Sequence, residues 1–181
     1  MAPRPCTPAP PPPELSDAPF VAIDFETADY QRDSACSVAL VRVEGGRIVG
    51  HAHRLIRPPR RDFVFTYLHG IAWRDVAGEP TFGAVWQDLL PLVEGASFLA
   101  AHNAPFDRGV LTRCCADAGL APPVQPFVCT VRLAKRTWPL PKASLDVVCR
   151  HLGIPLRHHE ALSDAEACAR ILLAARAQHA S

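Results

Sequence analysis

The sequence predicts an α/β fold, in which helices cover a sheet that combines antiparallel and parallel strands. Near the N-terminus, three short apolar runs have the character of strands, and two of them flank a Gly-Gly turn. Farther along the chain, strand-like and helix-like segments alternate, which is typical of a sheet with helices on its faces. The chain has 181 residues, 49% of them hydrophobic and 20% charged, as expected of one globular domain.

The first residues differ in composition from the rest of the chain. The segment PRPCTPAPPPPEL offers no periodic apolar face, so we expect residues 1–18 to form a disordered or polyproline-like tail and residues 19–181 to form the domain. The same segment also suits docking into the aromatic groove of a partner. It lacks the features of a signal peptide, and no run in the chain is long enough to cross a membrane, so we expect a cytoplasmic protein without membrane contact.

The domain is predicted to open with a strand followed by a hairpin. Residues 20–25 (FVAIDF) form an apolar run with β-branched residues, which indicates a buried strand that carries Asp24 near its end. Residues 36–43 and 47–56 are two further strand-like runs. The glycines at 45–46 between them supply the positive φ angles that a tight hairpin requires.

A helix, a strand and a second helix are predicted next. Thr81 can cap a helix in which Val85 and Leu89 begin an apolar face, and Pro91 should kink or end it. Residues 97–101 then indicate a buried strand. The following helix should run over residues 104–118, because Asn103 is a plausible N-cap, Pro105 suits the first turn, and Gly119 suits a left-handed C-cap.

Two helices are predicted in the C-terminal part. Ser144 and Gly153 bracket a short one, with apolar residues on one face. Residues 161–177 are rich in Ala and Leu, which favour a helix, and Ser163 with Glu166 suits a capping box at its start.

Four acidic residues and one histidine stand out against this framework. Asp24 and Glu26 are two residues apart at a strand end, so their side chains should leave the same face of the sheet. Asp107 follows the strand at 97–101, and Asp164 lies at the start of the last helix. Carboxylates that gather at a sheet edge repel one another unless a cation is present, and oxygen ligands favour magnesium or manganese. His159 should lie in the loop before the last helix.

The same residues occur in motifs that resemble those of the DEDDh-type 3′-to-5′ exonuclease family. The motifs IDFET, AHNAPFDRGVL and HEALSD occur in the order of that family, and LHGIAWRDVAGEPTFGAVW and ASLDVVCRHLGI resemble segments between them. The resemblance covers residues 21–174. It implies a ribonuclease H-like fold with an N-terminal antiparallel strand and hairpin, later parallel strands, and helices on both faces.

The resemblance also implies roles for particular residues. Two divalent cations, Mg²⁺ or Mn²⁺, would be held by the four acids, and His159 would act as the general base that activates the attacking water. The four metal ligands would be Asp24, Glu26, Asp107 and Asp164. The substrate would be the 3′ end of single-stranded nucleic acid, DNA rather than RNA, and the product a 5′-mononucleotide.

Further residues are implied to contact the terminal nucleotide. Those near the first motif and the HGI segment are Phe25, Thr27, His69 and Gly70. Asn103 and Phe106 of the second motif would line the same groove. His158 is expected to stay outside the metal site, since only His159 has the family's spacing to the last Asp, and His102 is expected to be structural.

Each acid also has a purely structural explanation. Asp24 suits a turn, and Asp107 and Asp164 suit the first turn of a helix through the dipole. The arginines at 54, 57, 60 and 61 suit either phosphate binding or a solvated loop. Because the four acids and His159 occur together in the family's order, the functional interpretation is favoured.

Other functions remain open at this level. A catalytically idle module that binds nucleic acid or a polymerase would keep the fold, and a phosphodiesterase acting on dinucleotides would keep the chemistry. A polymerase or other protein partner, tethered by the Pro-rich tail, and a homodimer are also compatible with the family. The chain ends soon after the last predicted helix, which favours a free-standing nuclease.

The bulk charge and the cysteines add limits. The formal net charge is +1, so affinity for nucleic acid must come from local basic patches and from metal ions. The chain has seven cysteines and no CxxC pair, which indicates reduced thiols and argues against a structural zinc site. Cys114 and Cys115 are expected to be packing residues.

Overall fold

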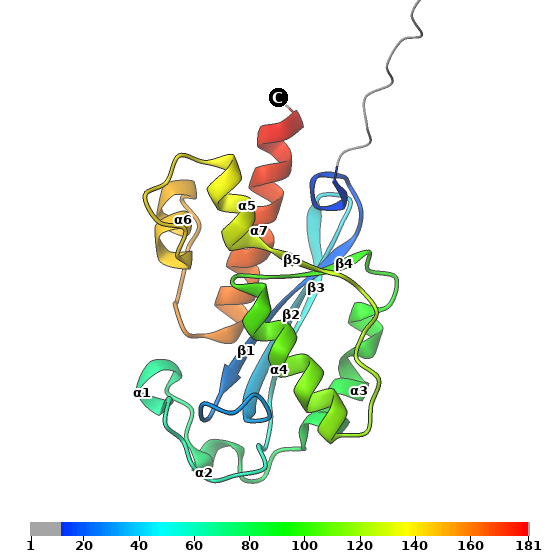
Figure 1. The fold of residues 1–181 in the computed structure, drawn as a ribbon, viewed down its shortest axis with the longest axis vertical. Coiled ribbons are helices and arrows are strands. Elements are labelled where there is room, and N and C mark those ends of the chain that lie inside the picture. The colour runs from blue at the N-terminus through cyan, green and yellow to red at the C-terminus, as the bar shows by residue number, and fades with distance from the viewer. Residues whose placement is uncertain (1–11, 181) are drawn as a thin grey trace, which may run out of the picture.

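A five-stranded mixed sheet forms the centre of the molecule, with the strand order β3-β2-β1-β4-β5 (Figure 1). The structure is a computed structural model, and it describes residues 12–180. Strand β1 pairs antiparallel with β2 and parallel with β4, β2 pairs antiparallel with β3, and β4 pairs parallel with β5. The strands are β1 (Phe20–Thr27), β2 (Ala35–Glu44), β3 (Arg47–Leu55), β4 (Phe98–Ala101) and β5 (Phe127–Cys129). The predicted mixed sheet, with its N-terminal antiparallel strand and hairpin, is therefore confirmed.

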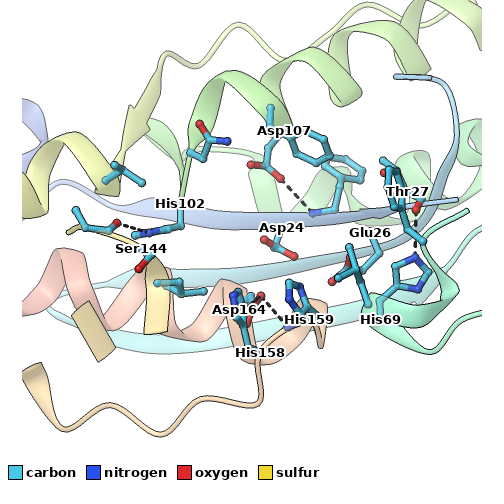
Figure 2. Close-up of a pocket in the computed structure, with 18 of the residues that line it drawn as sticks. Asp24, Glu26, Thr27, His69, His102, Asp107, Ser144, His158, His159 and Asp164 are labelled. Carbon is cyan, nitrogen blue, oxygen red and sulfur yellow. Dashed lines mark hydrogen bonds and ion pairs between the residues drawn. The ribbon is translucent and has the colours of Figure 1, made fainter. Parts of the chain in front are cut away.

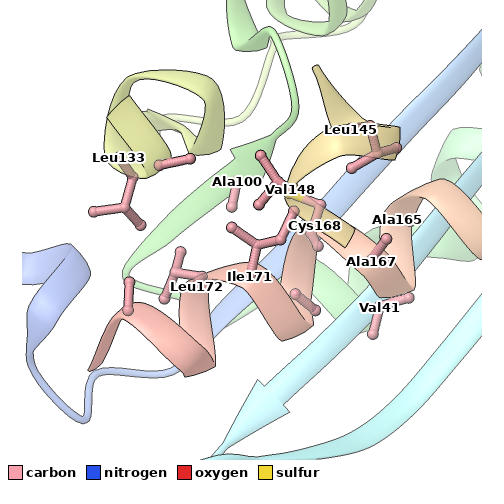
Figure 3. Packing of buried hydrophobic residues seen from close by; sticks show 14 of the residues in the cluster. Val41, Ala100, Leu133, Leu145, Val148, Ala165, Ala167, Cys168, Ile171 and Leu172 are labelled. Carbon is pink, nitrogen blue, oxygen red and sulfur yellow. The ribbon is translucent and has the colours of Figure 1, made fainter. Parts of the chain in front are cut away.

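Helices cover both faces of this sheet. Helices α3 and α4 pack on one face, and α5, α6 and α7 pack on the other (Figures 1 and 3). The helices are α1 (Thr66–His69), α2 (Trp73–Val76), α3 (Phe82–Val93), α4 (Ala104–Asp117), α5 (Thr130–Thr137), α6 (Leu145–Leu152) and α7 (Ala161–Ala180), and a 3-10 turn, η1, spans Pro13–Leu15. None of the helices within the described part of the chain combines the length and the apolar character that a membrane span requires.

The alternation of side chains along β1 divides the core into two layers. Phe20 and Ala22 pack toward α7, whereas Val21, Ile23 and Phe25 pack toward α3 and α4. Because both faces are covered by helices, the strand is a continuous apolar run, as the sequence indicates. The same period of two places the side chains at positions 24 and 26 on the α7 side, at the strand end where the apolar run stops.

The helix ends lie close to their predicted positions, but the caps differ. Thr81, Asn103 and Ser144 stand at N-cap positions, and none of their side chains makes a capping hydrogen bond. Helix α3 continues past Pro91 to Val93. The proposed capping box at Ser163 is wrong, because Ser163 lies inside α7 and its hydroxyl accepts a hydrogen bond from the backbone N–H of Arg157.

Several short elements have no counterpart in the sequence prediction. These are α1, α2, β5 and α5, the strand being only three residues long and the helices between four and eight. Hydrophobic periodicity needs a longer window than these segments provide, so their existence depends on the sheet edge and core on which they pack. Strand β5 matters most, because it extends the parallel part of the sheet and leads directly into α5.

The N-terminal boundary of the folded part differs from the predicted tail. Residues 1–11 lie outside the described residues. Within residues 12–18, η1 packs on α7, and Leu15 contacts the core. The guanidinium of Arg176 donates hydrogen bonds to the carbonyl oxygens of Glu14 and Ala18, at 3.0 and 2.9 Å. Residues 12–18 are therefore attached to the domain, because a buried arginine on α7 satisfies their backbone carbonyls.

Candidate active site

Three of the four predicted acids come together at the carboxyl end of β1. Asp24 and Glu26 extend from the strand, and Asp164 extends from the first turn of α7. Each of the three offers a carboxylate oxygen, and these oxygens lie within 4.8 Å of one another. Figure 2 shows the three side chains facing the same pocket. The predicted same-face arrangement of Asp24 and Glu26 therefore places both acids beside a residue almost 140 positions later in the chain.

Asp107 reaches the same region from the other side of β1 (Figure 2). It lies in the first turn of α4, it is 2% exposed, and its Oδ1 accepts a hydrogen bond from the backbone N–H of Phe25 at 3.2 Å. It is not one of the three residues whose oxygens lie within 4.8 Å of one another. Its negative charge nevertheless raises the pKa of Asp24 and Glu26, so it belongs to the same electrostatic cluster.

The four acids perturb one another strongly. Burial raises the pKa of Asp24 well above its ordinary value, and the charges of the other three acids add to this effect. Burial and the charges of Asp164 and Asp107 raise the pKa of Glu26 to about 8, and burial raises that of Asp107 to about 7. The pKa of Asp164 is also raised by burial, in part offset by hydrogen bonds from the two neighbouring histidines. Ionisation of all four carboxylates at neutral pH is therefore unfavourable without a compensating cation.

The donor set fits a divalent cation. Carboxylate oxygens are the ligands that magnesium and manganese prefer. In addition, Oδ1 of Asp164 is buried and has no hydrogen-bond partner among the described residues. Its Oδ2, by contrast, has two partners, the ring of His158 and the backbone N–H of His159. A buried carboxylate oxygen without a donor is costly unless a cation contacts it. The residues present thus match the divalent cations that the sequence motifs imply.

This electrostatic arrangement predicts how stability depends on pH and metal. A carboxyl group with a raised pKa in the folded state stabilises the fold only while it stays protonated, and that contribution is lost as the pH rises through the folded-state pKa. In chelator, we therefore expect the melting temperature to fall as the pH rises from about 4.5, the ordinary pKa of Glu26, to about 8, its pKa in the folded protein. Added Mg²⁺ or Mn²⁺ should restore it most at the alkaline end.

Thermal melts at several pH values, with chelator or metal, test this. The variant Glu26→Gln should lose part of the pH dependence in chelator, because the other three acids stay in the cluster, whereas Glu79→Gln, at a position outside the pocket, should keep all of it. A metal-free melting temperature that is constant or rises over this pH range would contradict the assignment of a crowded acidic cluster.

His159 lies at the rim of the cluster, in the loop before α7, as predicted. Its backbone adopts a positive φ of 67°, and its N–H donates a hydrogen bond to Oδ2 of Asp164 at 3.1 Å. Burial, together with the charge of His158, lowers the pKa of its imidazole below the ordinary value. The ring is therefore biased toward the neutral form, which can accept a proton.

His158, expected to stay outside the metal site, contacts the last of the four acids. Its Nδ1 lies 3.0 Å from Oδ2 of Asp164, and its ring stacks on that of His159 with the centroids 3.9 Å apart. The spacing rule selects one histidine and carries no information on its neighbour. The His-His pair in the sequence was the only available signal that both rings would lie near the last acid.

The cluster lies in a pocket of about 720 Å³ (Figure 2). Most of the residues expected to contact the substrate line it, namely Phe25, Thr27, His69, Asn103 and Phe106. Gly70 does not line it; instead it ends α1 with a φ of 77°, a conformation that glycine adopts without strain. Gly70 can therefore act on the pocket only through the position of the preceding His69.

His69 is held in place by its own backbone surroundings. Its Nδ1 accepts a hydrogen bond from the N–H of Ile71 at 3.1 Å, so the proton lies on Nε2, which is 3.1 Å from the carbonyl oxygen of Thr27. Burial lowers the pKa of His69, which favours this neutral tautomer. The contact fixes α1 against the end of β1 and shapes one end of the pocket.

His102 performs a similar function at the opposite end of the pocket. Its Nε2 lies 2.9 Å from the carbonyl oxygen of Ala143, and its Nδ1 lies 2.9 Å from Oγ1 of Thr130. Burial lowers its pKa to about 4, so the ring stays neutral at physiological pH. It joins the end of β4 to α5 and to the loop before α6, in agreement with the structural role expected from the sequence.

The remaining candidate groups lie away from this pocket. Arg60, one of the four clustered arginines, is paired with Asp29 and Asp33, and Arg61 lies over the ring of Trp73. Neither residue lines the pocket of the acidic cluster. Burial raises the pKa of Cys114 to about 12 and that of Cys115 to about 11, which agrees with packing and excludes an activated thiolate at neutral pH.

Comparison with known proteins places this geometry in context. The family model described as "Exonuclease", named for RNase T, matches residues 21–172. The chain is similar to the DNA polymerase III PolC-type of Thermotoga maritima, with 35% identity over 163 residues, which is 88% of this chain and 12% of that protein. It is also similar to Exodeoxyribonuclease 10 of Escherichia coli K12, with 32% identity over 158 residues, which is 83% of this chain and 66% of that protein. The chain thus spans a small part of the polymerase and about two thirds of the exodeoxyribonuclease.

One solved structure agrees with the sequence relatives. It is described as Exonuclease X in complex with 5′ overhanging duplex DNA, and it matches with a TM-score of 0.72 and 28% identity over 90% of this chain and 93% of that chain. The agreement in sheet and helix arrangement extends over nearly the whole described region.

Proposed function

Because the chain belongs to the exonuclease family whose model covers residues 21–172, as its DEDDh-type motifs predicted, we propose that it is a 3′-to-5′ exonuclease dependent on divalent cations. The proposed reaction is hydrolysis of the last phosphodiester bond at the 3′ end of single-stranded DNA, with release of 5′-mononucleotides. The observation that carries the proposal is the convergence of Asp24, Glu26 and Asp164 within 4.8 Å, in a pocket that is open to a substrate.

The four acids are the proposed ligands of two cations, Mg²⁺ or Mn²⁺. Cations held there would neutralise charge on the phosphate and stabilise the attacking and leaving oxygens of an in-line displacement. The acids would also position the substrate. They lie at the end of β1 and in the first turns of α4 and α7, and these fixed positions would determine where the scissile phosphate can lie. The hydrogen bond from Phe25 to Asp107 supports this fixed position.

His159 is the proposed general base. Its neutral imidazole would take the proton of the attacking water, a step that a permanently charged arginine cannot perform. The hydrogen bond from its backbone N–H to Asp164 holds the loop beside the acid, and its ring lines the pocket in which the phosphate would lie. His158 would orient the Asp164 carboxylate through its contact with Oδ2.

Recognition of a chain end is proposed for the wall near α1. There, Phe65 and Leu68 add apolar surface beside His69 and Thr27, and Phe106 lies on the other side of β1. Such a wall suits the sugar and base of a terminal nucleotide, because aromatic and apolar side chains stack on bases of any identity. Phe25 and Asn103 complete the set of residues proposed to contact this nucleotide.

DNA is the proposed substrate rather than RNA. Two sequence relatives at 30% identity or more are named for DNA chemistry, one as a DNA polymerase and one as an exodeoxyribonuclease, and the matching solved structure is described with duplex DNA. The polymerase partner, the homodimer and the role of the Pro-rich tail stay predictions.

One assay tests the function. The purified protein is incubated with end-labelled single-stranded DNA, single-stranded RNA or a dinucleotide, in the presence of Mg²⁺, Mn²⁺ or chelator. We expect shortening of the DNA from its 3′ end, release of 5′-mononucleotides, and no reaction in chelator, because the acidic cluster needs cations to hold a phosphate. Faster shortening of RNA would overturn the choice of DNA. Cleavage of the dinucleotide alone would favour a small-substrate phosphodiesterase, and no cleavage at all would favour a binding module.

A further inference from the structure

Two walls of the pocket differ in chemistry. The wall beside α1 carries the apolar side chains of Phe65 and Leu68, whereas the wall formed by α5 and the loop before α6 carries Lys135 and Lys142. Figure 2 shows His69 of the first wall and Ser144 of the second at opposite ends of the row of acids. A strand bound in the pocket would therefore meet apolar groups on one side of the acidic cluster and cations on the other.

The two lysines are unusual within this protein. They are the only lysines in the sequence, and every other permanently charged basic side chain is an arginine. Both are exposed and line the pocket, and within residues 12–180 neither forms an ion pair. Many arginines, by contrast, are paired with acids, among them Arg113, Arg136 and Arg150. The lysine charges are thus available for a ligand.

The positive charge continues beyond the pocket. Arg132 lies three residues before Lys135 on α5, so the two side chains are neighbours on the helix surface. Arg132 lines a second cavity, of about 680 Å³, together with Arg108 of α4 and the apolar Pro105 and Phe127. Like the lysines, Arg108 and Arg132 are exposed and have no acidic partner in the described part of the chain.

The chain segment that carries the two lysines contains no acidic residue. No acidic residue lies between Asp117 and Asp146, although the whole chain is almost balanced, with 19 Lys and Arg against 18 Asp and Glu. This interval contains β5, α5 and the loop that carries Lys142. Phosphate groups that leave the acidic cluster along this segment would meet its cations, and the segment itself contributes no anion.

We propose that Lys142, Lys135, Arg132 and Arg108 form a phosphate-binding track for the part of the strand on the 5′ side of the scissile bond. The proposal rests on the proposed exonuclease function and specifies its substrate: a single strand of several nucleotides, rather than a dinucleotide. The exposed lysine side chains contact successive phosphates near the pocket. Phe127 and Pro105, which line the same cavity as the two arginines, offer apolar surface to bases.

The physical signature of such a track is a dependence on salt. Each phosphate contact releases condensed counterions from the strand, so the logarithm of the binding constant falls with the logarithm of the salt concentration, by about 0.7 per contact for single strands. Removal of one cation in the track should reduce this slope by about that amount. Removal of an equally exposed cation elsewhere should leave the slope unchanged.

The test compares two track variants with a control of equal charge. The track variants are Lys135→Gln/Lys142→Gln and Arg108→Gln/Arg132→Gln. The control is Arg47→Gln/Arg170→Gln, since Arg47 begins β3 at the sheet end opposite the acids and Arg170 is an exposed residue of α7. Circular dichroism and thermal melts establish that each variant is folded.

Two measurements are made on each protein. Fluorescence anisotropy in chelator gives the affinity for a labelled single-stranded DNA of about 16 nucleotides, a length typical of single-strand binding sites, as a function of salt. Hydrolysis with Mn²⁺ gives the ratio of kcat/KM for that DNA to kcat/KM for a dinucleotide. We expect each track variant to lose about 1.4 in salt slope, from two lost contacts, and about tenfold in the ratio. The control should match the wild type.

The outcomes separate this proposal from the function on which it rests. If the wild type hydrolyses neither substrate, the exonuclease proposal fails, while the anisotropy slopes still decide whether the track binds nucleic acid. If the wild type hydrolyses the DNA and both track variants keep the wild-type salt slope and the wild-type ratio, the track is overturned. An equal loss in the control variant would overturn it as well, because the effect would then reflect net charge alone.

Discussion

Replacement of Asp24 by asparagine is expected to reduce hydrolysis of single-stranded DNA by at least about 10³-fold, while raising the melting temperature in chelator. The loss in rate follows from the cations, whose interaction with the reacting phosphate is worth several kcal/mol, since about 1.4 kcal/mol corresponds to a factor of ten. The gain in metal-free stability follows from the electrostatics, because Asp24 is buried among three other acids and its pKa is raised well above the ordinary value. An asparagine at this position carries no charge at any pH.

The combination of the two effects is what identifies a metal ligand. A residue with a purely structural role would lose stability and activity together when replaced. The matched control is Asp88→Asn, an exposed position on α3 outside the pocket, which should change neither quantity. The measurements are initial rates with saturating Mn²⁺ and thermal melts in chelator. Retained cleavage by Asp24→Asn would defeat the site assignment.

Replacement of His159 by glutamine is expected to reduce kcat by about 10²- to 10⁴-fold, the usual contribution of a positioned general base. Addition of more metal should not restore the rate, because glutamine cannot take the proton at any metal concentration. The hydrogen bond to Asp164 comes from the backbone N–H of His159 and is kept in the variant. The loss should therefore appear in kcat rather than in the metal dependence.

His158 provides the matched comparison for His159. The two rings stack on each other, but the ring of His158 also contacts the carboxylate of Asp164. In the variant His158→Gln, the Asp164 carboxylate loses the partner at 3.0 Å that orients it. Loss of such a partner typically weakens metal binding by about 10- to 100-fold, an effect that excess metal overcomes. Rate measurements over a range of Mn²⁺ concentrations distinguish the two histidines. If excess Mn²⁺ rescues His159→Gln and not His158→Gln, the assignment of the base must be exchanged.

The pH profile of kcat gives an independent check on His159. Burial lowers the pKa of its imidazole, so the neutral form that accepts a proton is reached at a lower pH than for an unperturbed histidine. The rate should rise with pH and level off, with the midpoint of the acid limb below about 6.5. This limb should be absent from the residual activity of His159→Gln.

The local sequence was sufficient for much of the fold. The apolar runs of β1 to β3, the Gly-Gly turn and the long Ala-rich helix α7 are all visible in short windows of sequence, because each element shows its own apolar pattern or turn residues. The period of two along a strand also predicts that Asp24 and Glu26 lie on one face of β1. Strand β5 and helix α5 escaped prediction because elements this short are stabilised by their neighbours rather than by propensity.

The sequence by itself thus determined the identity and order of the reactive side chains, and the family to which they belong. Only the tertiary structure brought Asp164 within 4.8 Å of the acids on β1, placed His158 against that carboxylate, and put Lys135 and Lys142 in the wall of the same pocket. The physical reason is that local patterns encode the direction in which a side chain leaves its own element. The distance between two elements far apart in sequence is set instead by how the apolar faces of the whole sheet and its helices pack together.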